Sequence, residues 1–184
     1  MVREMANRYR GLPPRTPDML LQVIRKFYRG AVSHYAFIQE KKAETLQAWE
    51  YYRKTGESGK LGESLTVLFH EFHFYVTCWL QLDLALYRLA RMEQTKSFQT
   101  IREQFHSEME RHLAVRSHLE DIPAAVEAQY QRCGEELNCV PHDQYWFGDL
   151  GYSVDQRSIS ALHELYQLVM AEKKLLDEKK PPCP

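Results

Sequence analysis

Two pairs of charged or titratable residues near the middle of the chain have spacings that could bring their side chains together in a catalytic site. Arg111 and His118 are seven residues apart, which is two turns along one face of an α-helix. At that spacing an arginine could stabilise a developing oxyanion while the histidine moves a proton. Arg116 and Glu120 are four residues apart, so we expect an ion pair that serves as a structural clamp or as part of a polar site.

The eight histidines raise the question of a metal site. His70 and His73 are three residues apart on one helical face, and with a third histidine such as His163 they could bind a single metal ion. Histidines with hydrogen-bond partners inside the core are the competing interpretation. A ferritin-like di-metal site requires two Glu-x-x-His steps, and the chain has only Glu103 with His106. We predict no cofactor and keep the three-histidine metal site as an alternative.

Several function classes have no support in the sequence. The chain contains no Gly-x-Ser-x-Gly elbow, no P-loop, no His-Glu-x-x-His motif and no Gly-rich dinucleotide fingerprint. Lys and Arg number 24 against 25 Asp and Glu, so the net charge of -1 gives no overall field that attracts nucleic acid. The first 30 residues alone are basic, with seven arginines and lysines against two acids, which is a local signal for a polyanion such as RNA.

The central segment resembles a known family. The spacing of Arg111 and His118 is similar to the Arg-x(4–6)-His motif of the HEPN superfamily (higher eukaryotes and prokaryotes nucleotide-binding). Arg116 and Glu120, followed by an aromatic hairpin at 145–154, also resemble a pattern of uncharacterised bacterial helical proteins. The resemblance implies an all-helical bundle. It further implies a dimeric, metal-independent ribonuclease of toxin–antitoxin or phage-defence systems, with these two arginines, the histidine and the glutamate as candidate catalytic residues.

Three features depart from the bacterial pattern, one of which is Pro123-Ala124-Ala125 in place of its acidic–basic ending. Ser117 stands where asparagine is usual, and Asp121 stands where histidine is usual. Our leading hypothesis is therefore a non-catalytic binding or assembly module of HEPN-like type, which forms a homodimer and binds a protein partner or RNA. A metal-independent ribonuclease that uses Arg111 or Arg116 with His118 is the first alternative. A metal-dependent helical-bundle enzyme is the second.

Apolar side chains that recur every three or four residues predict the helices that position these groups. We expect an all-α, up-and-down bundle of about five helices. The predicted helices cover approximately residues 17–53, 63–93, 97–121, 123–137 and 155–178. The helical period is lost between 138 and 155, where aromatic residues around a glycine-bearing turn predict a small β-hairpin or ordered loop before the last helix.

Local signals define several of these boundaries. Thr16 followed by Pro17 is typical of a helix start, because the hydroxyl can cap and proline fits the first helical position. Gly30 is expected to kink the first helix or to let a neighbour approach closely. The glycines of 55–62 predict a loop, and Pro123 predicts a new helix start.

The length and composition favour one globular domain over residues 1–184, with a basic amino-terminal tail at 1–15 and a carboxy-terminal tail at 179–184. No apolar run suits a signal-peptide core or a membrane-spanning helix, which predicts a cytoplasmic protein without a membrane partner. The cysteines form no Cys-x-x-Cys pair, a pattern that suits free thiols in a reducing cytosol. They are Cys78, Cys133, Cys139 and Cys183.

Overall fold

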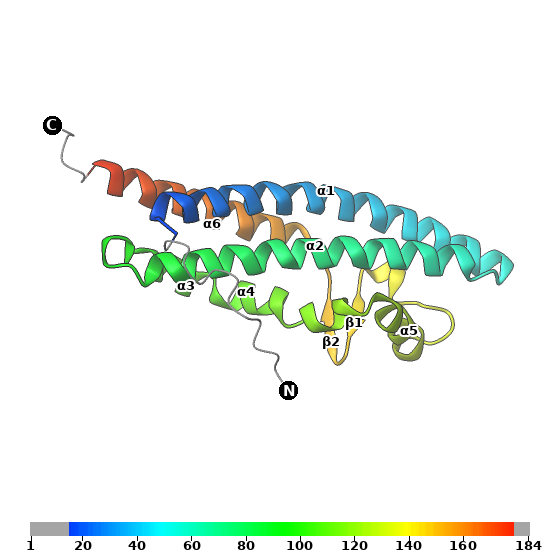
Figure 1. Ribbon diagram of the computed structural model, residues 1–184. Coiled ribbons are helices and arrows are strands. Elements are labelled where there is room, and N and C mark those ends of the chain that lie inside the picture. Colours follow the sequence, from blue (N-terminus) through cyan, green and yellow to red (C-terminus); the bar gives the residue numbers. More distant parts are fainter. Residues whose placement is uncertain (1–14, 179–184) are drawn as a thin grey trace.

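The computed structural model of the protein describes residues 15–178. This part of the chain contains six α-helices and a two-stranded hairpin before the last helix, so the predicted all-α bundle is confirmed. Two long antiparallel helices, α1 and α2, run the length of the molecule, with α6 alongside α1 and the shorter α3 and α4 beneath α2 (Figure 1). The predicted tails at 1–15 and 179–184 lie outside the described residues, apart from Arg15.

Helix α1 spans Pro17–Thr55 and begins where the capping signal predicts. The Thr16 hydroxyl oxygen accepts a hydrogen bond from the Met19 backbone N–H at 3.3 Å. The helix ends at Gly56, which has a φ of 78° and donates its backbone N–H to the Tyr52 carbonyl oxygen at 2.8 Å. Glycine adopts this left-handed conformation without steric cost, so it stops the helix cleanly.

Helix α2 spans Gly59–Ala90 and begins earlier than predicted. The predicted loop at 55–62 is therefore too long. The first turn of α2 places Leu61 in the core with no exposed surface, and this burial outweighs the low helix propensity of the neighbouring glycines. Gly30 lets the two long helices approach, because a Cβ atom there would lie 3.2 Å from the Cys78 sulfur. The predicted close approach is confirmed, and α1 continues through it.

The predicted continuous helix at 97–121 is wrong. This segment forms three shorter elements, which are α3 (Phe98–Gln104), α4 (His106–Leu113) and the 3-10 helix η2 (Arg116–Glu120). Phe105 interrupts the first two with a φ of -101° and a ψ of 9°. In a continuous helix Val115 would point about 120° away from Met109. The breaks allow both side chains to be buried, each with 1% of its surface exposed.

Helix α5 spans Ile122–Cys133 and is shorter at its end than predicted. The Asp121 side chain caps it by accepting a hydrogen bond from the Ala124 N–H at 3.2 Å. Gly134 follows with a φ of 75° and ends the helix. Two short 3-10 helices complete the connections, η1 at Glu93–Thr95 and η3 at Val140–His142.

The loop after α5 contains a disulfide between Cys133 and Cys139. This corrects the expectation that these two cysteines are free thiols; Cys78 is the free cysteine of the described residues. The loop is also held to α1, because the Tyr52 hydroxyl donates a hydrogen bond to the Glu135 carbonyl oxygen at 2.9 Å. The disulfide thus closes a loop that is already docked on the bundle.

The hairpin consists of β1 (Tyr145–Phe147) and β2 (Leu150–Tyr152), which pair antiparallel across a two-residue turn. The predicted hairpin is confirmed, and its strands occupy 145–152 of the predicted 145–154. Its aromatic rings pack on α2, with Phe69 at 5.7 Å and Phe72 at 5.4 Å from the Tyr145 ring centroid. Edge-to-face contacts of this kind fix the hairpin on the bundle.

Helix α6 spans Gln156–Glu178, close to the predicted 155–178. The Asp155 carboxylate caps it by accepting a hydrogen bond from the Ser158 N–H at 2.9 Å. Tyr28 of α1 stacks on Tyr166 of α6 with 3.8 Å between ring centroids. Across residues 15–178, we find no helix with the length and apolar character needed to cross a membrane.

We expect the Cys133–Cys139 disulfide to contribute about 2 kcal/mol to the free energy of unfolding, from the loop-closure entropy of the unfolded chain. Urea unfolding with and without dithiothreitol measures this contribution. The double variant Cys133→Ser/Cys139→Ser should match the reduced wild type and should not respond to dithiothreitol. Equal stability of the reduced and oxidised wild type would contradict the prediction.

Candidate functional site

The four predicted catalytic residues do not form one site, because Arg111 lies apart from the three residues on η2. Arg116 and Glu120 form the expected ion pair at 3.0 Å, but on the surface of η2, with 42% and 54% of their side chains exposed. Arg111 is half-buried and engaged with α4 and α6. His118 is exposed on η2. The shared helical face that their spacing requires is lost, because the helix ends before η2.

Arg111 and His118 contact opposite ends of the hairpin. The Arg111 guanidinium approaches the Ser153 carbonyl oxygen, which follows β2, at 3.4 Å. The His118 ring lies against the turn, where a Cβ atom on Gly148 would be 3.0 Å from the His118 Cε1 atom. The structure therefore does not bring this arginine and this histidine to one reacting group.

Arg111 instead belongs to a buried polar relay formed by four side chains. The relay runs from Tyr152 through His112 and Glu108 to Arg111. The Tyr152 hydroxyl lies 2.8 Å from His112 Nδ1, and His112 Nε2 lies 3.1 Å from Glu108 Oε1. The same carboxylate oxygen accepts a hydrogen bond from Arg111 Nη2 at 2.6 Å. His112 has no exposed surface, and Tyr152 and Glu108 have 3% and 7%.

The partners determine the protonation of the relay. Burial opposes the charge on Glu108, but hydrogen bonds from His112 and Arg111 outweigh it and lower the Glu108 pKa to about 2. The carboxylate is therefore ionised and only accepts hydrogen bonds, so His112 carries its proton on Nε2. His112 Nδ1 then accepts the hydrogen bond that the Tyr152 hydroxyl donates.

Burial keeps both partners of the Tyr152–His112 hydrogen bond neutral. It lowers the pKa of His112 to about 4, despite the neighbouring Glu108, and it raises the pKa of Tyr152 well above its ordinary value. Aromatic rings from α2 enclose the imidazole, with Trp79 stacked at 4.7 Å and Tyr75 edge-on at 5.3 Å between centroids. An uncharged imidazole is the form that such an apolar cage favours.

The order hydroxyl, imidazole, carboxylate has the connectivity of a nucleophile with its general base and orienting acid. A nucleophile must also reach a substrate. The Tyr152 residue is 3% exposed, and its hydroxyl already donates to His112. The relay is therefore closed to substrates, and its physical role is to hold β2 against α4.

The relay continues to the start of α6. Arg111 donates a hydrogen bond to the Ser158 hydroxyl oxygen, and that hydroxyl donates to the Asp155 cap at 3.0 Å. Arg157 lies 3.9 Å from the second oxygen of Glu108, with 78% of its side chain exposed. The guanidinium of Arg111 thus joins α4, the hairpin and α6.

A second buried charge holds the other side of the hairpin. The Lys42 ammonium of α1 donates hydrogen bonds to the Asp143 carboxylate, the Ser153 hydroxyl and the Val154 carbonyl oxygen, each at 2.7 Å. Burial lowers the Lys42 pKa although Asp143 opposes this shift. All three donor positions of the ammonium are occupied, so this lysine is a structural anchor.

The three histidines predicted as metal ligands are not assembled into a site. His70 is exposed on α2, and the His73 ring lies 6.3 Å from the Phe74 ring. His163 Nδ1 is 2.9 Å from the Tyr28 hydroxyl between α1 and α6. Within residues 15–178, no three histidine, cysteine, aspartate or glutamate side chains are grouped so that they could hold a metal ion.

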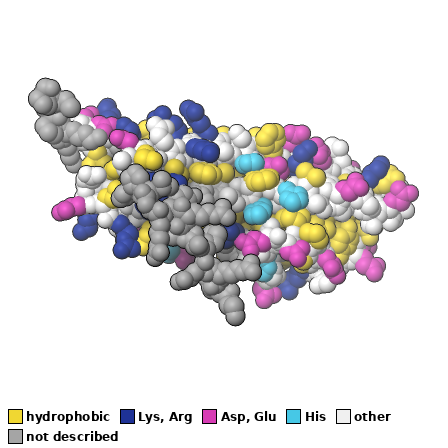
Figure 2. Space-filling model, in the orientation of Figure 1, with side chains coloured by type: hydrophobic (Ala, Val, Ile, Leu, Met, Phe, Trp, Pro, Cys, Tyr) yellow, Lys and Arg dark blue, Asp and Glu magenta, His cyan; other side chains and the backbone are white. Residues whose placement is uncertain are grey.

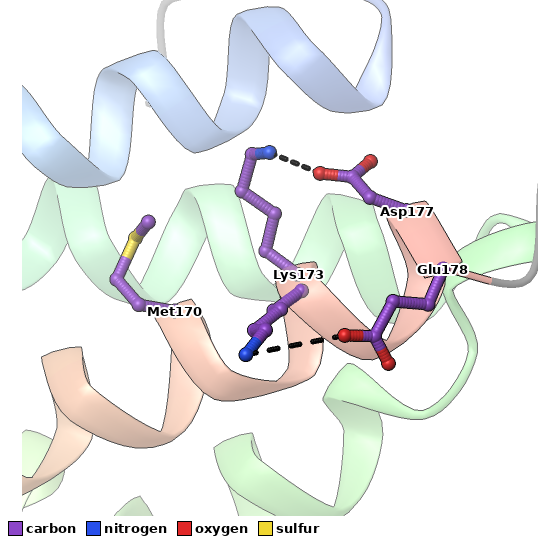
Figure 3. A pocket seen from close by; sticks show the side chains of 5 residues that line it. Met170, Lys173, Asp177 and Glu178 are labelled. Carbon is purple, nitrogen blue, oxygen red and sulfur yellow. Dashed lines mark hydrogen bonds and ion pairs between the residues drawn. The ribbon is translucent and has the colours of Figure 1, made fainter.

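Two surface hollows lie outside the relay. One, of about 250 Å³, lies between η2, α5 and the hairpin turn, and its lining includes His118, Asp121 and Trp146. The other, of about 460 Å³, is an open hollow at the end of α6 (Figure 3). Its lysines pair with acids one turn on, Lys173 with Asp177 and Lys174 with Glu178, which is typical of a solvated helix face.

Sequence reasoning missed the centre of the relay. Glu108 precedes Arg111 by three residues and His112 by four, and both spacings place side chains together on a helix. That signal was available. The contribution of Tyr152 was not, because it lies 40 residues from His112 in the sequence.

The comparisons with known proteins leave the family open. No protein-family model matches the chain, and no curated protein or solved structure matches it.

We expect acid to destabilise the fold through His112. In the unfolded chain its pKa is about 6.5, and in the fold it is about 4, so between these values the unfolded state binds more protons. The free energy of unfolding should therefore be at its full value above pH 6.5 and fall as the pH drops towards 4. The lowered pKa of Glu108 adds a further loss below its ordinary 4.5, towards about 2.

Urea unfolding across this pH range measures the effect, and an NMR titration of the His112 ring reports its folded pKa directly. The variant His112→Gln lacks the titrating imidazole and should show a shallower pH dependence between 6.5 and 4. The matched control His142→Gln changes an exposed histidine and should keep the wild-type slope. Parallel slopes in all three proteins would show that His112 is not the group responsible.

Proposed function

We propose that this protein is a non-catalytic module that acts by binding another protein surface. The supporting observation is the position of its exposed hydrophobic side chains. Seven of the nine large hydrophobic residues with substantial exposure lie on the two long helices. They are Met19, Phe37 and Leu46 on α1 and Val67, Phe74, Leu84 and Tyr87 on α2. Of these, Val67, Phe74 and Leu84 share one face of α2, and exposed apolar side chains that share a face are typical of interaction surfaces, whereas single scattered ones are not.

The absence of an accessible catalytic array among the described residues supports the same proposal. The one arrangement with triad-like connectivity is the Tyr152–His112–Glu108 relay, which is closed to solvent. Arg111 is committed to that relay, and Arg116 is paired with Glu120. These side chains stabilise the bundle, and what remains for function is the surface.

A HEPN-like fold remains our proposal for the family. The helical bundle, the aromatic hairpin before the last helix and the Arg116–Glu120 pair support it. A place in toxin–antitoxin or phage-defence systems follows from that resemblance alone. We also propose a cytoplasmic location, which the Cys133–Cys139 disulfide makes testable. The pair should be reduced in cytosolic protein, and an oxidised pair in freshly trapped cells would contradict this location.

A metal-independent ribonuclease is the second candidate. His118 lines the hollow of about 250 Å³ beside Trp146, where an RNA base could stack, and Arg116 is two residues away in the sequence. General acid–base catalysis by such a histidine typically contributes a factor of about 10² to 10⁴. This candidate does not use Arg111, because that guanidinium is engaged elsewhere.

Incubation of the purified protein with single-stranded RNA and a chelator distinguishes the two functions. We expect the wild type, Arg116→Ala and His118→Ala to show the same background cleavage, because no catalytic array is accessible. Circular dichroism confirms that the variants fold, as expected for side chains on the surface. Wild-type cleavage that falls by about 10² or more in either folded variant would refute the non-catalytic proposal and establish the ribonuclease.

A further inference from the structure

Helix α2 carries a regular exposed stripe that begins at Glu63 and ends at Arg88. Alternating steps of four and three residues connect its members, which is the spacing of a coiled-coil seam. The inner members are Val67, His70, Phe74, Thr77, Gln81 and Leu84. All positions of the stripe are exposed or half-exposed. The opposite sides of α2 are covered by α1 and by the segment from α3 to α5.

The rest of the described chain neither covers the apolar side chains of the stripe nor provides partners for its polar ones. Val67, Phe74 and Leu84 are 44%, 51% and 38% exposed. No hydrogen bond or ion pair joins the polar side chains of the stripe to other residues within 15–178. The face on which α1 and α2 lie in front of α6 shows hydrophobic and histidine side chains side by side near its middle (Figures 1 and 2). A stripe with three exposed apolar side chains among polar ones therefore lies open along the helix.

Two copies of the stripe that run in opposite directions place complementary side chains opposite each other. Glu63 then lies opposite Arg88, which joins an acid to a base. Two inner pairs match in kind, with Val67 opposite Leu84 and His70 opposite Gln81, and at the centre the ring of Phe74 lies opposite the smaller Thr77. Opposite charges fall at both ends, an aliphatic pair lies inside each, and polar side chains flank the centre. A partner of unrelated sequence has no reason to produce this symmetry.

We propose that the stripe binds the same stripe of a second copy of this chain, antiparallel, with the two-fold axis between Phe74 and Thr77. This deepens the proposed binding function by naming the partner, and it rests on that function. A closed two-fold dimer requires a self-complementary surface, which the reversed stripe provides. The two Glu63–Arg88 pairs exclude the parallel arrangement, because that would place like charges together at each end.

The dimensions suit a specific interface. From Glu63 to Arg88 the helix rises about 37 Å at 1.5 Å per residue, enough for several turns of interlocking side chains. Phe37 of α1 is 50% exposed and widens the seam, since its ring lies 6.4 Å from His34, which stacks on Phe74. Polar residues within a seam lower its stability while setting its register. We therefore expect a reversible dimer with a Kd on the order of micromolar.

Charge reversal on the full chain tests the proposal through sedimentation equilibrium. The wild type should be a dimer in reversible exchange with monomer. The single variants Glu63→Arg and Arg88→Glu each place like charges together at both ends, so each should raise the Kd by about tenfold or more. The double variant Glu63→Arg/Arg88→Glu restores opposite charges and should return the Kd to within about threefold of wild type.

The control Glu50→Arg applies the same charge change at an exposed position of α1 outside the stripe and should leave the Kd unchanged. A wild type that remains monomeric at about 200 µM, well above the expected Kd, overturns the seam. The proposal is also overturned if the wild type dimerises but the Kd of the double variant is as high as that of the single variants. Neither outcome affects the non-catalytic proposal, which the RNA cleavage assay decides separately.

Cysteine cross-linking tests the direction of the seam independently of charge. Under mild oxidation, Val67→Cys/Leu84→Cys should give a covalent dimer, because each new cysteine faces its counterpart in the second copy. Val67→Cys alone should not, since two copies of position 67 lie about 25 Å apart in the antiparallel seam. Cross-linking of Val67→Cys alone would indicate a parallel seam, and a double variant that does not cross-link would mean that positions 67 and 84 do not meet; either result overturns the proposal.

Discussion

The fold depends on an imidazole that has been removed from water. A buried His112 is tolerated only if both ring nitrogens have hydrogen-bond partners, because an unsatisfied buried polar group costs about 1–3 kcal/mol. Glu108 supplies one partner from the preceding turn of α4, and Tyr152 supplies the other from the end of β2. Satisfying one ring thus forces the hairpin to dock. The docked hairpin in turn places Arg111 beside Ser158 at the start of α6.

Strongly shifted pKa values usually direct attention to catalytic sites, and here they have a structural cause. The pKa of Glu108 is low because Arg111 and His112 donate hydrogen bonds to it, and the pKa of His112 is low because the ring is enclosed by α2 aromatics. The shift of His112 requires exclusion of solvent, whereas the shift of Glu108 comes from its donors and is opposed by burial. The same exclusion prevents a substrate from reaching the Tyr152 hydroxyl, so the features that perturb these groups also remove them from chemistry.

Hydrophobic periodicity predicted the elements that depend on neighbouring residues. It failed where packing against distant segments determines the backbone conformation. The long helices, the cap at Thr16 and the aromatic hairpin follow from local patterns, and the structure has all three. The hypothesis of a shared Arg111–His118 face assumed an unbroken helix over 97–121. Burial of Val115 and Met109 against α2 breaks that helix, and no local pattern measures the competition between helical hydrogen bonds and such packing. The Cys133–Cys139 pair was missed for a different reason: its two cysteines are only six residues apart, but the spacing alone does not show that the loop between them turns back.

Helix α2 explains why one element can serve both the core and a surface. Besides its core-facing sides, α2 carries exposed apolar side chains, and covering them would add to its stability. Its neighbours within the chain leave the stripe that includes Val67 and Phe74 open, and a second copy would complete its burial. No residue of the stripe lines the hollow that contains His118. A second copy bound at the stripe would therefore contribute no residue to the surroundings of His118. The proposed assembly surface on α2 and the candidate ribonuclease site at η2 are therefore physically separate parts of this bundle.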